Sequence, residues 1–334
     1  MLQLDETDEA VLDLLQKDGR MSNRDIATSL GVGEATVRQR LRRMINGDVM
    51  RVVAVADFQA VGFDLILFIG VEVLGRSVEE AANEIAALPE VLACNIVMGR
   101  HDIEVIAAVD NRSSISDLII RRIARTRGIH RISTGVVIET LKYQVDVSGG
   151  DPRAFLETFH FLDSTPKALN RFDSTNLKIL KCLWKDARET NQRIAATIGT
   201  SEGTVRARIK KMVDDNLIRI QAITNIDAHA RPLLALVGID VILEHAHAVA
   251  LSLSRMRESG VVVMLTGRHD IMMLLFARDA PHLQQLVFEH IRSIPGVLHT
   301  EVSRPIEHIK FDYRFGRIAP ALTQEKGNAA PHPK

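Results

Sequence analysis

Two short turns carry the side chains best suited to holding a small charged molecule. The sequence Gly-Arg-His-Asp-Ile occurs at residues 99–103 and again at 267–271. An arginine can bind a carboxylate and an aspartate can bind an ammonium, so each turn could hold a zwitterion such as an amino acid. The same residues also suit a polar hairpin turn whose aspartate accepts hydrogen bonds from backbone N–H groups. The recurrence of the turn is compatible with both interpretations.

Positive charge is concentrated in two other segments of a chain that is neutral overall, with 42 Lys and Arg against 42 Asp and Glu. Residues 33–51 hold five arginines against two acidic residues, and residues 201–219 hold five Lys and Arg against three. This local charge suits contacts to DNA phosphates, with polar neighbours reading bases in the major groove. A single basic segment could instead be a charged helix face that contacts only solvent and binds no partner. Arg40 and Arg208 are expected next to the face of each segment that packs on the protein core, so they could serve packing or ion pairing and not DNA binding.

Each basic segment forms the third helix of a helix-turn-helix pattern. This pattern occurs twice in the chain. In its first occurrence, which we call the first copy, apolar spacing predicts a helix around 11–15 capped by Thr7, and further helices at 23–30, ended by Gly31, and at 34–46. A strand or wing at 49–56 completes a winged helix-turn-helix unit. The predicted DNA-binding residues on the two third helices are Glu34, Thr36, Arg38, Gln39, Arg42, Arg43, Ser201, Glu202, Thr204, Arg206, Lys210 and Lys211.

A second pattern, typical of a ferredoxin-like domain, follows each helix-turn-helix unit. Its order is β-α-β-β-α-β, and in the first copy the expected elements are strands 65–73, 91–98, 103–109 and 129–141 with helices 78–88 and 113–126. The strands are apolar on both faces, so the sheet face without helices must also be buried. Sheet-to-sheet pairing with the second copy would bury it. The fold class is therefore α+β.

The turns and the basic helices belong to one internal repeat. When the sequence is shifted by 168 positions, 18 of the 48 residues from 4 to 51 are identical, where chance would give about three. The predicted segments are a winged helix-turn-helix at 1–60, a ferredoxin-like domain at 61–144, a linker at 145–171, a second winged helix-turn-helix at 172–228, a second ferredoxin-like domain at 229–313 and a disordered tail at 314–334.

Composition excludes several other classes of protein. Cys94 and Cys182 are the only cysteines, so a disulfide framework and a multi-cysteine metal site are excluded. The acidic N-terminus has no signal-peptide pattern and no apolar run is long enough to cross a membrane, so a cytoplasmic location is expected. The cluster of Glu244, His245 and His247 could bind a metal, but a solvated helix start is the favoured interpretation. No catalytic residue, metal or cofactor is predicted.

Taken together, the motifs resemble those of the Lrp/AsnC (feast/famine) family of transcription regulators. The matching motifs are Ile26-Ala27 with Leu30-Gly31, Thr36-Val37-Arg38, the Gly-x-x-Asp turn and the closing strand at 128–134. The resemblance implies amino-acid effectors bound near that turn, where the sensing domains of neighbouring dimers meet. The residues that it assigns to the effector are Gly99, Arg100, His101, Asp102, Thr134, Gly267, Arg268, His269 and Asp270.

The chain departs from that family pattern at several points. It has two units where the usual member has one. The family's serine at the start of the recognition helix is Gly33 in the first copy and Ser201 in the second, which predicts unequal DNA binding. Val302 replaces Thr134, and Pro305 enters the last strand of the second copy, where an edge or a bulge is expected. One copy could therefore bind the effector while the other has only a structural role.

The sequence predicts a regulator that binds double-stranded DNA and responds to an amino acid or a related small molecule, as a homo-oligomer with no membrane partner. One chain would then replace a conventional dimer. One alternative is an enzyme that resembles the siroheme decarboxylases, with His101 and His269 as its candidate residues, although aromatic residues are scarce. Another is an assembly partner of other family members that does not itself bind DNA.

Overall fold

Both helix-turn-helix units have the predicted order of three helices and a strand. The computed structural model describes residues 4–58, 60–143, 147–148, 172–225, 233–312 and 314–316. The first unit consists of α1 (Glu6–Lys17), α2 (Asn23–Leu30), α3 (Glu34–Asn46) and β1 (Met50–Asp57). The second consists of α7 (Ser174–Lys185), α8 (Asn191–Ile198), α9 (Glu202–Asp214) and β7 (Ile218–Asn225).

Local sequence explains where these helices begin and end. The cap of α1 is Asp5 and not the predicted Thr7, because Asp5 accepts a hydrogen bond from the backbone N–H of Asp8 and the Asp8 carboxylate accepts one in return. Gly31 ends α2 as predicted, at a φ of 66° that favours glycine. Ser201 caps α9 through its hydroxyl, whereas Gly33 gives α3 no side-chain cap.

The β-α-β-β-α-β order of the sensing domains is also confirmed in both copies. The first has β2 (Leu65–Val73), α4 (Val78–Ala86), β3 (Val91–Met98), β4 (Ile103–Val109), α5 (Arg112–Ser116) continued by η1 (Asp117–Arg122) and η2 (Ile123–Arg125), and β5 (Ile129–Tyr143). The second has β8 (Leu233–Val241), η5 (Leu243–His245), α10 (Ala246–Ser254), β9 (Ser259–Thr266), β10 (Ile271–Ala277), α11 (Ala280–Gln285), η6 (Leu286–Ile291) and β11 (Val297–Phe311).

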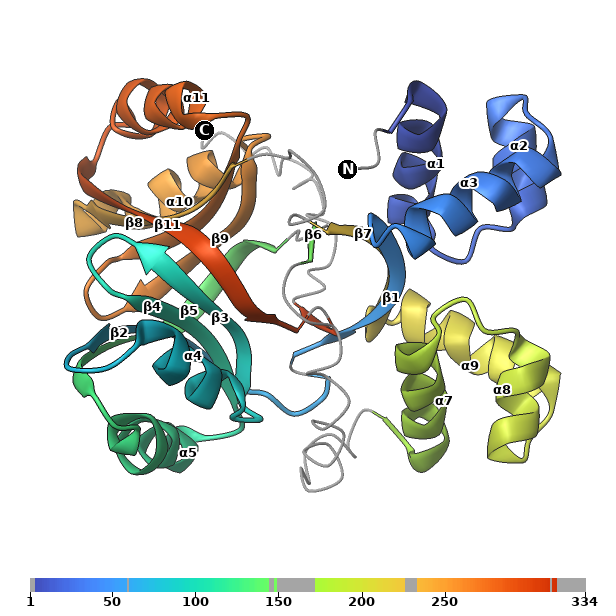
Figure 1. Cartoon of the computed structure of the whole chain (residues 1–334), viewed down its shortest axis with the longest axis horizontal. Helices are drawn as coiled ribbons and strands as arrows, with labels where there is room; N and C mark the ends of the chain where they lie inside the picture. The colour runs from blue at the N-terminus through green and yellow to red at the C-terminus, as the bar shows by residue number, and fades with distance from the viewer. Residues whose placement is uncertain are drawn as a thin grey trace, which may run out of the picture.

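The two four-stranded sheets join edge to edge into one closed barrel, in the order β10-β8-β11-β3-β4-β2-β5-β9. The closing strand of each copy extends into the sheet of the other, because β5 pairs with β9 and β11 pairs with β3. Helices of both copies lie on the outside of the barrel (Figure 1). The open sheet faces are thus buried against the second copy as predicted, through shared strand edges as well as face packing.

Pro305 illustrates how the long closing strand of the second copy is accommodated. It pairs with Val97 of β3, and the strand register shifts between Pro305 and Glu307. The predicted bulge is therefore confirmed. β11 as a whole lies between β8 and β3, but its pairing with β8 ends at Ser303, so Pro305 is paired on one side only, as the predicted edge position implies. A bulge accommodates proline in a paired strand because proline has no N–H to donate.

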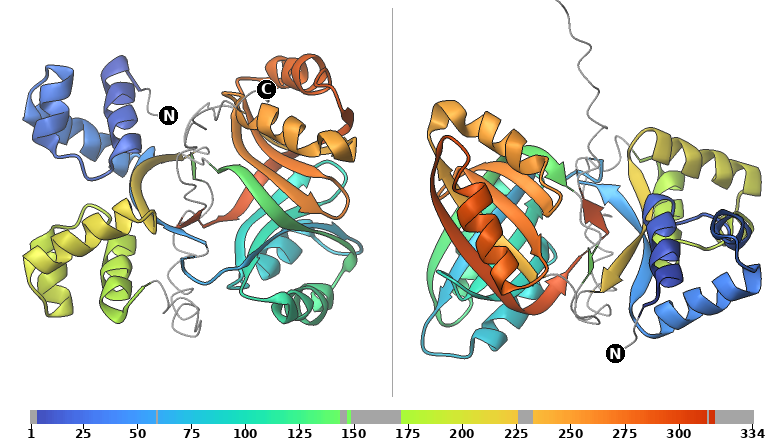
Figure 2. Two further views of the ribbon diagram at one scale, coloured as in Figure 1. Left: turned by 180° about the vertical axis from the view of Figure 1, so that it is seen from behind. Right: turned by 90° about the horizontal axis from the view of Figure 1, so that it is seen from above.

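The strand after each helix-turn-helix unit does not form a local wing in the described residues. Instead, β1 and β7 pair with each other in antiparallel orientation (Figure 2). Val53 lies opposite Gln221, its own equivalent 168 positions later, so the pseudo-twofold axis of the chain passes between these two residues. The ribbon sets the two helix-turn-helix units side by side, away from the barrel (Figure 1).

Two predicted boundaries differ from the structure. Within the predicted linker 145–171, Val147–Ser148 form β6 and pair with β7; the rest of that linker lies outside the described residues. Within the predicted tail 314–334, Phe315–Gly316 form β12 and pair with β1, and Phe315 is buried. Residues 317–334 are outside the described part. Pairing across the repeat is the reason for both differences. No helix among the described residues is long and apolar enough to cross a membrane.

Candidate functional site

The predicted DNA-binding residues lie on the solvent-facing side of α3 and α9. All of them are exposed except Thr204, which is half-buried. The opposite faces of the helices are anchored by buried apolar residues, such as Val37 and Met44 in α3 and Val205 and Met212 in α9. This division between a buried apolar face and an exposed basic face is the arrangement that the spacing predicts.

Intramolecular ion pairs separate the basic residues into two groups. Arg40 donates to Asp5 and Asp8 at 2.7 and 2.8 Å, and Arg208 contacts Asp173 in the same way, so both tie the third helix to the first. Arg43, which we predicted to contact DNA, also pairs with the buried Asp8.

The remaining basic residues of these helices keep their charge at the surface. Arg38 pairs with Glu34 one turn earlier at 2.8 Å, and Lys210 pairs with Asp214 at 2.6 Å. Such exposed pairs on one helix are weak and exchange readily for other partners. Neither Arg42 nor Lys211 has a hydrogen-bond partner in the part of the chain that the structure describes. Their side chains are available for a phosphate or a base.

A reciprocal pair of arginines, which our sequence interpretation missed, joins the two helix-turn-helix units. Arg20 donates to the carbonyl oxygens of Ala187 and Glu189 at 3.1 and 2.8 Å and to Asn191 at 3.0 Å. Its equivalent, Arg188, makes the mirror set of contacts with the first unit.

The acceptors of Arg188 are Gly19, Met21 and Asn23, at 2.9, 3.0 and 3.1 Å. Burial lowers the pKa of both guanidiniums, yet arginine stays charged at neutral pH. The identity of the two arginines in the repeat was the signal available in the sequence. The six contacts fix the relative position of the two units.

The two Gly-Arg-His-Asp turns lie where the copies meet in the barrel. A side chain on Gly99 would collide with Ser303, and one on Gly267, whose φ is +118°, would collide with the Thr134 carbonyl oxygen. Each turn therefore packs on the closing strand of the other copy. Thr134, assigned to the effector by the family resemblance, lines one gap with His101 of its own copy and His269 of the other, and its carbonyl oxygen lies against Gly267.

The two aspartates of the turns have a structural role. A carboxylate oxygen of Asp102 accepts the backbone N–H of Val73 at 2.7 Å, and Asp270 does the same with Val241 at 2.9 Å. This is the hairpin interpretation considered above, and the equivalence of the two bonds explains why the aspartate recurs. The arrangement gives no support to these aspartates as ligands of an ammonium group.

The histidines of the turns have unequal surroundings. His101 contacts the Ser133 hydroxyl through Nε2 at 2.8 Å, and its buried Nδ1 has no hydrogen-bond partner. His269 contacts Asp240 through Nδ1 at 2.7 Å. The His101 ring lies against Gly70 and the His269 ring lies against Gly238. A Cβ atom on either glycine would come within 2.3 Å of the neighbouring imidazole ring. The glycines therefore make the space that the histidines occupy.

Arg268 and Glu301 add a charged pair to the second turn, with their nearest atoms 2.6 Å apart. Burial acts to raise the pKa of Glu301, but the hydrogen bond from Arg268 and the charges of His269 and Arg100 bring the pKa below its usual value. The first copy has Ser133 at the position of Glu301, so only the second turn carries this pair. The gap between the two histidines measures about 50 Å³, well below the range typical of ligand pockets.

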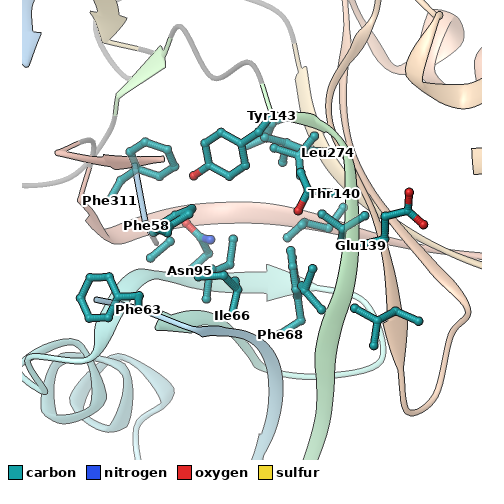
Figure 3. Close-up of a pocket in the computed structure, with 18 of the residues that line it drawn as sticks. Phe58, Phe63, Ile66, Phe68, Asn95, Glu139, Thr140, Tyr143, Leu274 and Phe311 are labelled. Carbon is teal, nitrogen blue, oxygen red and sulfur yellow. The ribbon is translucent and has the colours of Figure 1, made fainter. Parts of the chain in front are cut away.

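A larger cavity of about 430 Å³ lies between the two sheets, inside the barrel (Figure 3). Its wall combines residues of both copies, including equivalent pairs of the repeat such as Ile66 with Leu234 and Ala93 with Val261. The lining is mostly aliphatic and aromatic, with polar groups from Asn95, Thr140, Tyr143 and His308. Our sequence interpretation did not identify this cavity, since its residues come from strands that are far apart in the chain. The predicted cluster of Glu244, His245 and His247 forms no metal site among the described residues.

Comparisons with known families follow the same division of the chain. The Lrp/AsnC ligand binding domain model matches residues 66–147 and 234–315, the AsnC-type helix-turn-helix domain matches residues 4–45, and a winged helix-turn-helix DNA-binding model matches residues 172–219. Fold and site thus define a tandem helix-turn-helix DNA-binding protein with two ligand-binding domains.

Relatives with a single unit agree with this class. An uncharacterized HTH-type transcriptional regulator of Pyrococcus abyssi is 36% identical over 144 residues, which cover 42% of this chain and 90% of that protein. One from Pyrococcus horikoshii is 35% identical over 144 residues with the same coverage. The chain belongs to the Lrp/AsnC family of transcription regulators, as a tandem duplication of the family unit.

A solved structure with two fused units is also similar. The siroheme decarboxylase NirDL matches with a TM-score of 0.63 and 13% identity, over 92% of this chain and 93% of that one. A second structure of the same enzyme, in complex with an iron-uroporphyrin III analogue, matches with the same score. At this identity the similarity concerns the fold, and it shows that the arrangement of two fused units exists elsewhere.

Proposed function

We propose that this protein is a transcription regulator in which one chain does the work of a dimer. The observation that carries the proposal is the placement of two exposed, basic recognition helices, α3 and α9, by a pseudo-twofold axis between Val53 and Gln221. A DNA site of matching symmetry has two half-sites separated by about one helical turn or a multiple of it. The β1–β7 ribbon and the reciprocal arginines join the two units and fix the positions of the two helices relative to each other.

The two half-sites read by this chain differ from each other. Gln39 in α3 corresponds to Ala207 in α9, and Arg42 corresponds to Lys210. Glutamine forms two hydrogen bonds with adenine in the major groove, whereas alanine offers a methyl contact to thymine. Arginine binds guanine with two hydrogen bonds, and lysine presents a single flexible charge. The preferred DNA is therefore a pseudo-palindrome with unequal halves.

The test is DNA binding by fluorescence anisotropy, with fragments from upstream of the protein's own gene, across a range of salt. We expect binding to weaken as salt rises, because phosphate contacts release counterions. The double variant Arg38→Ala with Arg206→Ala should bind at least about tenfold more weakly, since each lost DNA contact costs about 1–3 kcal/mol.

The matched control is Arg121→Ala with Arg257→Ala. These exposed arginines lie on the sensing domains and their loss changes net charge by the same amount. If the control weakens binding as much as the recognition-helix variant does, general charge and not the two helices accounts for the affinity, and the proposal fails.

The effector is a small molecule, and by our proposal an amino acid or a close relative. We place its site at the turns around residues 99–102 and 267–270, completed by another chain, because the gap within one chain is too small. The same anisotropy assay with a panel of amino acids tests this: a shift in DNA affinity identifies the effector. A response to none of them would remove amino acids from the proposal while leaving DNA binding intact.

An enzyme that acts on a tetrapyrrole is not favoured, and we propose that the protein is not an enzyme. Uroporphyrin-type rings carry many carboxylates, which need cationic partners. None of the described residues that line the 430 Å³ cavity is a lysine or an arginine. His101 and His269, the candidate residues for such chemistry, are held by Ser133 and Asp240 outside that cavity. A shifted Soret band on addition of iron porphyrin would contradict this conclusion.

The remaining alternative, an assembly partner that does not bind DNA itself, fits the exposed basic helices poorly. Both α3 and α9 keep a continuous polar face, and nothing in the described residues covers either one. A regulator must also reach the chromosome, so we propose that the protein works in the cytoplasm.

A further inference from the structure

The cavity between the sheets gathers aromatic side chains from a chain that has few. The whole sequence contains 11 Phe, 2 Tyr and 1 Trp. Five of these residues line this one cavity: Phe58, Phe63, Phe68, Tyr143 and Phe311. The Phe58 and Tyr143 rings meet edge to face, 5.5 Å apart at 90°. Rings held in this way present both faces and edges to a bound aromatic molecule.

The cavity has few polar groups, and their hydrogen-bonding roles as donors or acceptors can be assigned. His308 and Asn95 are joined by a contact of 2.7 Å between Nδ1 and Oδ1. Because the amide oxygen only accepts, the histidine Nδ1 donates, which makes Nε2 an acceptor in the neutral ring. Burial raises the pKa of Tyr143, so its hydroxyl remains a donor at physiological pH. In Figure 3 the polar ends of Asn95 and Tyr143 lie close to the Phe58 ring, and Thr140 lies beside Leu274.

The charge around the cavity restricts what can enter. Its charged lining residues, apart from His308, are Asp64 and Glu139, which are both exposed at its margin. The described lining includes no lysine or arginine that could neutralise an anion. A carboxylate buried there would lose its hydration and find no lysine or arginine among the described lining residues, which is strongly unfavourable. Neutral molecules avoid this penalty, and a single cation can offset it by pairing with Asp64 or Glu139.

We propose that this cavity binds a small aromatic molecule, neutral or singly cationic, with about two fused rings and one hydrogen-bonding group. A volume of about 430 Å³ is within the usual range for small-molecule sites. The site is separate from the turns around residues 99–102 and 267–270. It does not depend on the function proposed above, because binding is measured without DNA.

The position of the site also connects it with the rest of the molecule. Phe58 and Phe63 belong to the segment between β1 and β2, which joins the β1–β7 ribbon to the barrel. A bound ligand would contact this segment and the sheets of both copies together. A ligand that binds one arrangement of the ribbon on the barrel more tightly than others therefore stabilises that arrangement.

The test uses three probes that share one ring system and differ in charge: indole, tryptamine and indole-3-acetate. Isothermal titration calorimetry on the full chain measures each affinity. We expect indole and tryptamine to bind and indole-3-acetate to bind at least about tenfold more weakly, because its carboxylate meets no lysine or arginine in the described part of the lining. Equal or tighter binding of indole-3-acetate would overturn the charge selectivity that we propose.

Variants locate the binding. Ala93 lines the cavity and is buried on β3, so Ala93→Phe fills part of the space and should reduce indole affinity at least about tenfold. The matched control is Ala248→Phe, which adds the same side chain on the exposed face of α10. Asn95→Leu, which removes a polar group but little volume, is a second variant in case Ala93→Phe does not fold, as judged by circular dichroism.

The outcomes are distinct. Loss of indole binding in Ala93→Phe or Asn95→Leu, with binding kept in Ala248→Phe, supports the site. Binding that is equal in all folded variants places the ligand elsewhere and overturns the proposal. Failure of the parent chain to bind either indole or tryptamine overturns it as well.

Discussion

At the scale of single residues, the most informative groups are the carboxylates that cap the first helix of each unit. Asp5 and Asp173 each accept a backbone N–H and a guanidinium of the third helix, Arg40 or Arg208. The hydrogen bonds from these arginines lower the pKa of both carboxyl groups below 3.8. The two ion pairs position the recognition helices from behind, and this role explains why Arg40 and Arg208 are identical in the repeat.

This pairing predicts a pH dependence of stability. Since the folded pKa is lower than the unfolded one, the stabilising effect is complete above about pH 4 and disappears as the pH falls through the folded value. Replacing both residues by asparagine keeps the helix cap but removes the charge. The double variant should therefore melt below the parent at pH 7, and the difference should shrink as the pH is lowered below about 4.

Thermal denaturation followed by circular dichroism measures the difference. Asp13→Asn, on the exposed face of α1, serves as the control for loss of a negative charge. A gap between parent and double variant that stays the same from pH 7 to pH 3 would contradict the assigned ion pairs.

At the scale of elements, the spacing of the recognition helices depends on the β1–β7 ribbon and on the Arg20 and Arg188 contacts. The β1–β7 ribbon forms the centre of a four-stranded sheet with β12 and β6 at its edges, whereas the arginines join the turns before α2 and α8 directly. Each guanidinium donates hydrogen bonds to three acceptors of the other unit. Removal of the two arginine side chains therefore leaves the ribbon as the main connection between the units.

We expect Arg20→Ala with Arg188→Ala to change the response of the protein to half-site spacing. Anisotropy with operators whose spacer is lengthened or shortened in single base pairs should show a sharp preference in the parent. In the double variant, affinity for the preferred spacing should fall about three- to tenfold, and the difference between spacings should shrink. The control, Arg24→Ala, removes a nearby exposed charge on α2. A spacing preference as sharp as that of the parent would show that the ribbon alone sets the distance.

At the scale of the whole molecule, the barrel leaves matching apolar residues exposed on both copies. Ile120 and Phe288 are equivalent in the repeat and are 63% and 53% exposed, and Ile138 and Ile306 are equivalent and are 64% and 59% exposed. Large apolar residues that stay exposed at equivalent places in both copies mark an interaction surface. This surface is the place where we expect chains to assemble, and where the turn sites would be completed.

Assembly can be tested by light scattering coupled to size exclusion. The variant Ile138→Glu with Ile306→Glu should shift the protein from a homo-oligomer to a single chain, because charges replace the apolar contacts. The control, Leu243→Glu, changes a leucine that is 76% exposed but has Gly75 at the equivalent position. If both variants elute like the parent, assembly uses another surface or the chain acts alone.

The sequence by itself determined the elements and their order, since these depend on local interactions. Helix α3 and strand β2 have the predicted ends, and the difference between the Gly33 and Ser201 caps was visible in the residue types. The repeat likewise predicted two equivalent units, because equal apolar spacing produces equal folds. Exposure of residues such as Arg42 followed from helical periodicity alone.

Only the tertiary structure decided how the two copies meet, because strand partners and long-range hydrogen bonds leave no local pattern. It converted the predicted wings into the β1–β7 ribbon and placed Phe315 in a sheet rather than in the tail. Burial also separates residues that look alike in sequence. Exposed arginines on α3 face solvent, while Arg20 is held by carbonyl groups 167 to 171 positions away. The aromatic cavity belongs to neither copy, so it exists only once the barrel has closed.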